Sequence, residues 1–185
     1  MSFDRAAAVR RYRQAIAEGL RWMLARPALG LTNKPGFLNT KVSSLTLADY
    51  TGADGLRGPG WTYGWIQGRG LEALACHAAG LEGRDPDLAA ALDAAGRRLY
   101  GLMGALVAGD GHAYFLYDPE GRPVRPEGGG VVPQSPAGEI FTYSDAFAAK
   151  GLVAAAARYA PADLPDRLAY LARVIEAIRE GRFLM

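Results

Sequence analysis

Five segments with helical patterns are joined by connections that alternate between short and long, and this alternation limits the folds open to the chain. The short connections, 81–84 and 161–162, are typical of antiparallel helical hairpins. The long connections, 26–60 and 109–139, exceed what a compact domain needs to join two helices, and long ordered loops are commonly functional. The pattern therefore predicts helical hairpins whose two long loops gather at one end of the molecule.

Three of the five segments have the polar and apolar faces of a surface helix: 2–25, 85–106 and 163–181. Asp85 followed by Pro86 predicts a capped start for the second, and Asp163 is placed to cap the third. The third is the most regular, because its apolar residues repeat at intervals of four and three. They are Leu164, Leu168, Leu171, Ile175 and Ile178. We call these three the outer helices.

The other two segments, 61–80 and 140–160, are apolar on most sides and rich in Gly and Ala, so we expect inner helices buried all round. Gly64 and Gly68 would allow a neighbouring backbone to approach closely. The order outer, inner, outer, inner, outer predicts an all-α fold of the α/α toroid type, here an incomplete arc of about five helices forming one domain over 1–185.

The long connections contain patterns of their own. Strand-like residues occupy 37–47 in the first, and 112–117 in the second, where the turn 118–121 predicts a small β-hairpin. The run Glu127-Gly128-Gly129-Gly130 lacks the strand and helix that flank a phosphate-binding loop, and we interpret it as a flexible loop.

Composition excludes several classes of function. The net charge of +2 gives no reason to expect a nucleic-acid partner. No stretch has the roughly 18 uninterrupted apolar residues of a membrane span, and the N-terminus has no export signal, so we expect no membrane association and a cytoplasmic location. With two histidines and one cysteine, no zinc-binding spacing exists, and we expect neither a metal nor a cofactor.

One face of the first inner helix carries most of the candidate chemistry. Its members follow at helical spacing: Trp61, Trp65, Arg69, Glu72 and Cys76. An arginine among apolar neighbours needs a partner or a function, so Arg69 either pairs with Glu72 or Glu139 or binds a ligand. On the second inner helix, Ser144 or Asp145 would cap the first turn or bind a sugar hydroxyl, and we favour the cap.

Three stretches together resemble the N-acylglucosamine 2-epimerase family, also called the renin-binding-protein family. They are WTYGWIQGRGLEALA (61–75), HAYFLYDPEGRPV (112–124) and FTYSDAFAAKGLVAAAARY (141–159). The resemblance implies a six-hairpin α/α barrel with a central pocket that epimerises free or N-acyl sugars. It implies that Arg69 stabilises the enediolate formed when a histidine removes the proton next to the carbonyl. Tyr63, Trp65 and Gln67 would contact the sugar or support the residues that do.

The chain also departs from that family. The histidines that transfer protons there belong to later hairpins, and neither His77 nor His112 stands at a family catalytic position. We interpret His77 as a core residue and His112 as an exposed loop residue. We therefore expect 1–185 to be the N-terminal part of such a barrel and inactive alone. Its exposed inner helices would be covered by the rest of a longer polypeptide, by a second copy in a homodimer, or by closure into a smaller bundle.

Three functions follow as hypotheses. The first is a sugar 2-epimerase-like isomerase, active in a full-length context. The second is a non-catalytic carbohydrate- or protein-binding module in which Trp61, Tyr63 and Trp65 stack on the ligand. The third is a glycoside hydrolase, which would need two carboxylates across a cleft, drawn from Glu72, Glu139 and Asp145.

Overall fold

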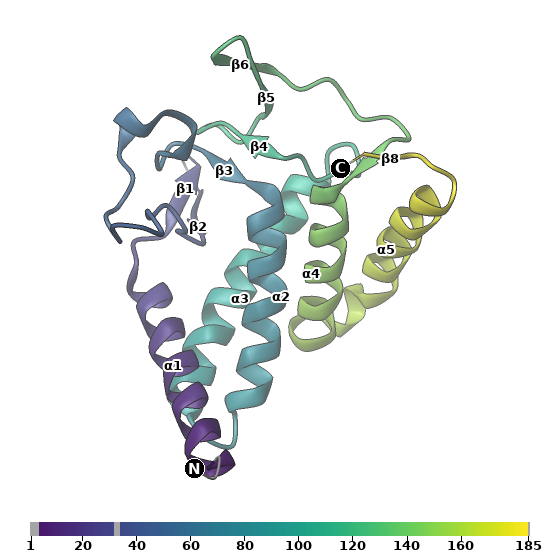
Figure 1. Ribbon diagram of the computed structural model, residues 1–185. Coiled ribbons are helices and arrows are strands. Elements are labelled where there is room, and N and C mark those ends of the chain that lie inside the picture. The colour runs from purple at the N-terminus through teal and green to yellow at the C-terminus, as the bar shows by residue number, and fades with distance from the viewer. Residues whose placement is uncertain (1–3, 32–33, 185) are drawn as a thin grey trace.

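The computed structural model describes residues 4–31 and 34–184 and shows a mainly α-helical chain with a small antiparallel sheet (Figure 1). The long helices are α1 (Arg5–Ala25), α2 (Gly64–Leu81), α3 (Pro86–Val107), α4 (Tyr143–Tyr159) and α5 (Leu164–Arg179). All five predicted helices are confirmed in order and approximate extent. The predicted start of the first helix at Ser2 lies outside the described residues.

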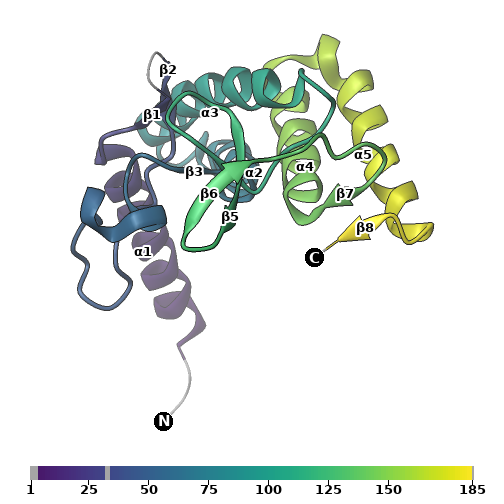
Figure 2. The same ribbon diagram turned by 90° about the horizontal axis from the view of Figure 1, so that it is seen from above.

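The helices form two rows (Figure 2). Helices α2 and α4 lie side by side and share the most extensive helix contact, while α3 packs against both of them. At the two ends, α1 packs on α3 and α5 packs on α4. Viewed from above, α1, α3 and α5 follow the outside of an arc whose inside is formed by α2 and α4. The predicted division into outer and inner helices therefore holds for these five.

Small residues explain how closely α2 and α4 approach. A Cβ added at Gly68 would lie 2.6 Å from the carbonyl carbon of Phe147 and 2.7 Å from the backbone nitrogen of Ala148. Both atoms belong to the main chain of α4 and have no freedom to rotate away. The expected close approach at Gly68 is confirmed, and it brings the backbones of the two inner helices into direct contact.

Of the two aspartates expected to cap helices, Asp85 forms the cap and Asp163 does not. Asp85 caps α3 as predicted, since its Oδ1 accepts a hydrogen bond from the Leu88 N–H at 3.2 Å, with Pro86 in the first turn. The prediction that Asp163 caps α5 is wrong. Its carboxylate instead accepts a hydrogen bond from the Tyr100 hydroxyl at 2.6 Å, which ties α5 to α3.

The short strands gather at the end of the molecule where α2 and α4 begin (Figure 1). A two-stranded antiparallel sheet consists of β1 (Leu29–Leu31) and β2 (Lys34–Phe37). The four-stranded antiparallel sheet consists of β3 (Thr62–Tyr63), β4 (Leu116–Tyr117), β5 (Pro123–Glu127) and β6 (Gly130–Pro133). A parallel pair consists of β7 (Phe141–Thr142) and β8 (Phe183–Leu184). The long connections therefore meet above the inner helices, as predicted.

Three local predictions for these connections are wrong. The segment 37–47 is no strand: β2 ends at Phe37, and Leu45 beyond it is 92% exposed, so its apolar side chain finds no core. In 112–117 only the last two residues form a strand, because side chains bind the backbone N–H groups before them, although the small β-hairpin predicted at the turn 118–121 is confirmed by the pairing of β4 with β5. The glycine run is a tight hairpin turn, in which Gly128 and Gly129 supply the two positive φ angles that such a turn needs.

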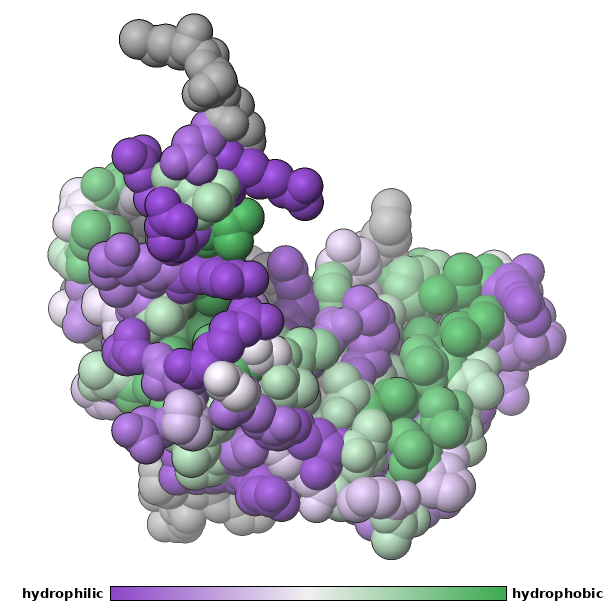
Figure 3. Space-filling model, turned by 90° about the horizontal axis from the view of Figure 1, so that it is seen from below, coloured by the Kyte–Doolittle hydropathy of each residue, from purple (hydrophilic) through white to green (hydrophobic). Residues whose placement is uncertain are grey.

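The outer helices are less covered than their sequence patterns predict. In α5, Leu168, Ile175 and Ile178 remain exposed, and in α1 the ring of Tyr12 does. In Figure 3, which views the molecule from the end opposite the strands, apolar residues gather on the side where α4 and α5 lie. None of the helices in the described residues is long and apolar enough to cross a membrane.

Candidate functional site

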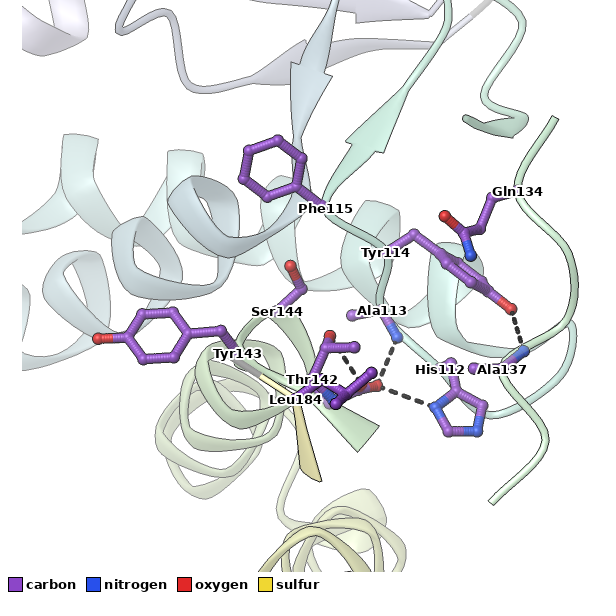
Figure 4. A pocket seen from close by; sticks show the side chains of 11 residues that line it. His112, Ala113, Tyr114, Phe115, Gln134, Ala137, Thr142, Tyr143, Ser144 and Leu184 are labelled. Carbon is purple, nitrogen blue, oxygen red and sulfur yellow. Dashed lines mark hydrogen bonds and ion pairs between the residues drawn. The ribbon is translucent and has the colours of Figure 1, made fainter. Parts of the chain in front are cut away.

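Two adjoining cavities lie where the second long connection passes over the start of α4. One has a volume of about 320 Å³, and His112 and Leu184 are among the residues that line it. The other has a volume of about 430 Å³ and is lined by Trp65, Phe115, Tyr143 and Ser144. Phe115, Tyr143 and Ser144 line both cavities. Figure 4 shows Tyr143 and Ser144 at the start of α4, with Phe115 on the strand connection beside them.

Below the cavities, an exposed seam runs between α2 and α4. We call it the inner seam and define it by Trp65, Arg69 and Glu72 on α2 together with Phe147 and Lys150 on α4. The rings of Trp65 and Phe147 lie 6.3 Å apart, and Lys150 Nζ lies 3.3 Å from Glu72 Oε1. The prediction that the inner helices are buried all round is therefore wrong for this face, where polar side chains remain in contact with solvent.

Arg69 is an exposed cation on this seam. Its guanidinium carbon lies 5.2 Å from the ring centroid of Phe147 and 5.9 Å from that of Trp65. The alternative in which Arg69 pairs with Glu72 or Glu139 is wrong, since within 4–31 and 34–184 neither acid forms an ion pair with it and Glu72 binds Lys150. Arg69 thus presents its N–H donors beside an aromatic surface.

Trp65 combines an aromatic wall with a donor that has no partner. Its side chain is half-buried against the larger cavity, and its indole Nε1 is buried without a hydrogen-bond partner among the described residues. Buried N–H groups in folded proteins are nearly always satisfied. An unsatisfied indole beside a cavity is therefore a candidate donor to a ligand oxygen.

Tyr63 and Gln67 attach the first long connection to α2. The Tyr63 hydroxyl donates to the carbonyl of Leu56 at 3.2 Å, and burial raises the pKa of this hydroxyl. Gln67 is fully buried, and its amide accepts from the Leu38 N–H at 2.8 Å and donates to the Leu38 carbonyl at 3.0 Å. The ring of Tyr63 packs edge-on against Phe115, with centroids 5.2 Å apart. Tyr63 therefore supports Phe115, which lines the cavities, and Gln67 holds the first long connection on α2.

His112 is buried, which corrects the prediction of an exposed loop residue. Only 3% of it is accessible, and its ring packs on Phe141 with centroids 4.5 Å apart. Its Nε2 lies 2.8 Å from the Gly138 carbonyl oxygen. Its Nδ1 lies 3.3 Å from Asp145 Oδ1, outside hydrogen-bond geometry. Both ring nitrogens therefore face groups of the protein itself.

Asp145 caps α4, as predicted, and also holds the surrounding segments together. Its carboxylate accepts hydrogen bonds from the Thr142 N–H at 2.7 Å, the Ala113 N–H at 2.8 Å and the Tyr170 hydroxyl at 2.8 Å. Burial raises the pKa of Tyr170 well above its ordinary value, and the neighbouring Asp145 carboxylate raises it further. The Tyr170 hydroxyl therefore stays protonated near neutral pH and donates a hydrogen bond to this carboxylate.

The sequence interpretation missed Phe115, Phe147 and Lys150. A signal existed for two of them, because Tyr143, Phe147 and Lys150 follow at intervals of four and three and so share one face of α4. The rings of Tyr143 and Phe147 lie 4.8 Å apart on that face. Phe115 had no such signal, since its position depends on how the connection 109–139 folds.

The remaining candidate ionisable residues lie away from the site or are bound to other groups of the protein. His77 is half-buried and lines a groove between α1 and the far end of α2. Glu139 is exposed, while Glu72 and Asp145 are engaged with other groups. Among the described residues, no three His, Cys, Asp or Glu side chains are grouped to hold a metal ion. A scan against models of protein families and a search of curated proteins found no match to this chain.

Proposed function

We propose that the inner seam and the cavity above it bind a free or N-acyl sugar, as one wall of the central pocket of an epimerase-like α/α barrel. The observation that carries this proposal is Arg69, an exposed guanidinium without an ion-pair partner among the described residues, beside the rings of Trp65 and Phe147. Aromatic rings pack against the C–H faces of sugars, while arginine offers planar donors to their oxygens.

The arrangement of the helices supports the toroidal part of the proposal. Helices α2 and α4 begin at the same end, and α1, α3 and α5 surround them on one side (Figure 2). The volume of about 430 Å³ beside Trp65 falls within the roughly 300–1,000 Å³ of small-molecule sites. Trp65 Nε1 would donate a second hydrogen bond to the same ligand.

Arg69 would act on charge in such a site. Removal of a proton next to a sugar carbonyl places negative charge on the carbonyl oxygen, and a guanidinium placed there stabilises it. The proton transfers need an acid and a base, and the described part of the chain places no histidine on the inner seam: His112 is buried beside the smaller cavity and His77 lies at the far end of α2. The chain by itself would therefore bind a sugar without epimerising it.

A second candidate is a carbohydrate-binding module without catalysis. It is favoured by the burial of His112, whose Nε2 contacts the Gly138 carbonyl oxygen, and by the place of His77 at the far end of α2. The two candidates share the ligand class and differ in whether further residues complete the pocket. The first candidate predicts that a longer polypeptide containing this chain epimerises the sugar and that Arg69→Ala abolishes this turnover. The second candidate predicts no epimerase activity in the longer polypeptide.

Sugar binding by this chain is the direct test. We would titrate it with glucose, mannose and their N-acetyl-2-amino derivatives, following the Trp fluorescence and the heat of binding. We expect Arg69→Ala to weaken binding of the preferred sugar at least tenfold. The matched control is Arg173→Ala, because Arg173 also lies over a ring, that of Tyr170, but on α5. Absence of binding across the panel, or equal affinities of the wild type and Arg69→Ala, would refute the proposal.

A further inference from the structure

A third cavity lies within the first long connection, away from the inner seam. It has a volume of about 300 Å³, and none of the residues around it lines the two cavities described above. The residues around it are Pro27, Ala28, Leu29, Asn39, Lys41, Asp49, Tyr50 and Pro59. Among these residues only Lys41 has a side-chain amine, and Lys41 is buried.

Lys41 is the buried amine of this cavity, with 5% of the residue exposed. Its Nζ lies 3.4 Å from the Leu56 carbonyl oxygen and 4.3 Å from the centroid of the Tyr63 ring. Among the described residues no carboxylate forms an ion pair with it, because the acid of the cavity, Asp49, pairs with Arg26 at 2.5 Å. A buried ammonium group without a counter-ion is costly, so its neutral form is favoured.

Burial lowers the pKa of Lys41 to about 8. At neutral pH such an amine is neutral far more often than a lysine with the ordinary pKa of 10.5. Neutral lysine is the nucleophilic form.

We propose that Lys41 is a nucleophilic amine and that its cavity takes a small aldehyde or ketone. The lone pair of Nζ adds to the carbonyl carbon, and the nitrogen gives up its two protons in turn to the carbonyl oxygen. Loss of that oxygen as water leaves a C=N bond to Nζ, so the reaction consumes one amine and one carbonyl and needs no oxidant or reductant. The cavity volume of about 300 Å³ is at the lower end of the range for small-molecule sites, and the face of Tyr63 beside Nζ would stabilise the protonated imine.

The lysine content of the chain makes this testable. The sequence holds three lysines, Lys34, Lys41 and Lys150. Lys150 serves as the internal control, because it is half-exposed and lies 3.3 Å from a carboxylate oxygen of Glu72. We would treat the folded protein at pH 7 with glycolaldehyde and cyanoborohydride, which traps imines as stable amines, and follow each lysine by peptide mass spectrometry. We expect Lys41 to be modified at least tenfold faster than Lys150.

Two further measurements separate reactivity of the folded site from properties of the peptide. In denaturing urea the preference for Lys41 should disappear, because both amines are then in water. Between pH 7 and 9 the rate at Lys41 should level off, because its amine loses its proton over this range. Modification of Lys41 no faster than Lys150 in the folded protein, or a preference that persists in urea, would overturn the proposal. Lys41→Arg should remove the fast phase and leave the rate at Lys150 unchanged.

Discussion

The two inner helices begin in similar ways and end up with different tasks. Each is preceded by a two-residue strand that lies within a motif of an aromatic residue, threonine and tyrosine. The motif is 61–63 at α2 and 141–143 at α4, where Tyr143 is already the first helical residue. Both starts lie at the same end of the molecule (Figure 1). The first turn of α4 binds the Asp145 carboxylate within the protein, whereas the first turn of α2 leaves the indole Nε1 of Trp65 without a partner among the described residues.

At the third helical position α4 has Asp145 and α2 has Ile66. Asp145 closes a capping box with Thr142 and is wholly inaccessible to solvent. Ile66 has no polar atom to offer, and no side chain caps α2, although the Gly64 N–H donates to the Phe115 carbonyl. The same local framework thus fixes the packing around α4 and leaves a surface suited to a ligand on α2.

The largest effect should come from removing the carboxylate at the start of α4. We expect Asp145→Ala to lower the free energy of unfolding by about 3–5 kcal/mol, since it leaves buried donors of Thr142, Ala113 and Tyr170 unsatisfied. Urea denaturation followed by circular dichroism measures this loss. Glu72→Ala, which removes an acid of the inner seam, should cost less than about 1 kcal/mol. Equal losses in the two variants would remove the contrast between the two helices.

The next effect tests the contact between the two helices themselves. Gly68→Ala places a methyl group 2.6 Å from the main chain of Phe147, so α2 and α4 must separate. We expect a loss of about 2–4 kcal/mol in the free energy of unfolding, measured in urea. The control is Gly80→Ala in the same helix, where nothing lies within 4 Å and the better helix propensity of Ala should stabilise by up to about 1 kcal/mol. A Gly68→Ala protein as stable as the wild type would disprove the close crossing.

Local periodicity was sufficient to predict the helices and their division into two rows. The amphipathic and apolar segments differ in composition over many residues, and the α3 cap combines Asp85 and Pro86 within one turn. The α5 cap failed for a different reason. Asp163 has the right residue type and place, but Tyr100 on α3 competes for its carboxylate, and a sequence gives no sign of a partner that distant.

The candidate site was predictable only where it follows one helix. Arg69 and Trp65 share a face of α2, so their proximity follows from spacing. The burial of His112 depends on how residues 138–145, which include Phe141 and Asp145, pack against it. The exposure of Arg69 likewise depends on where α4 packs. The sequence interpretation was wrong about His112 and left two alternatives open for Arg69, because burial is a property of the assembled helices.

Alkaline pH should reduce the contribution of Tyr170, which binds Asp145 at the start of α4, to the free energy of unfolding. In the folded state the pKa of Tyr170 is raised above its ordinary value, chiefly by burial, so above pH 10 the unfolded chain loses a proton that the folded chain keeps. Stability is therefore complete below pH 10 and falls as the pH rises beyond it, by about 1.4 kcal/mol per pH unit for this group. The difference in unfolding free energy between wild type and Tyr170→Phe, measured from pH 9 to 11.5, should shrink with pH. A constant difference would contradict this assignment.

The smallest effect on stability should come from Arg69, which the proposed function makes the most important residue for binding. Because Arg69 is exposed and forms no ion pair within the described residues, Arg69→Ala should change the free energy of unfolding by less than about 0.5 kcal/mol. The control is Arg158→Ala on α4, where the guanidinium binds Asp93 at 2.6 Å and Glu82 at 2.7 Å and should cost about 1–2 kcal/mol. Thermal and urea unfolding measure both. A loss above 1 kcal/mol for Arg69→Ala would mean that its contacts with Trp65 and Phe147 hold α2 to α4. The arginine would then be part of the framework, and the contrast with Asp145 would no longer separate a structural helix start from a binding one.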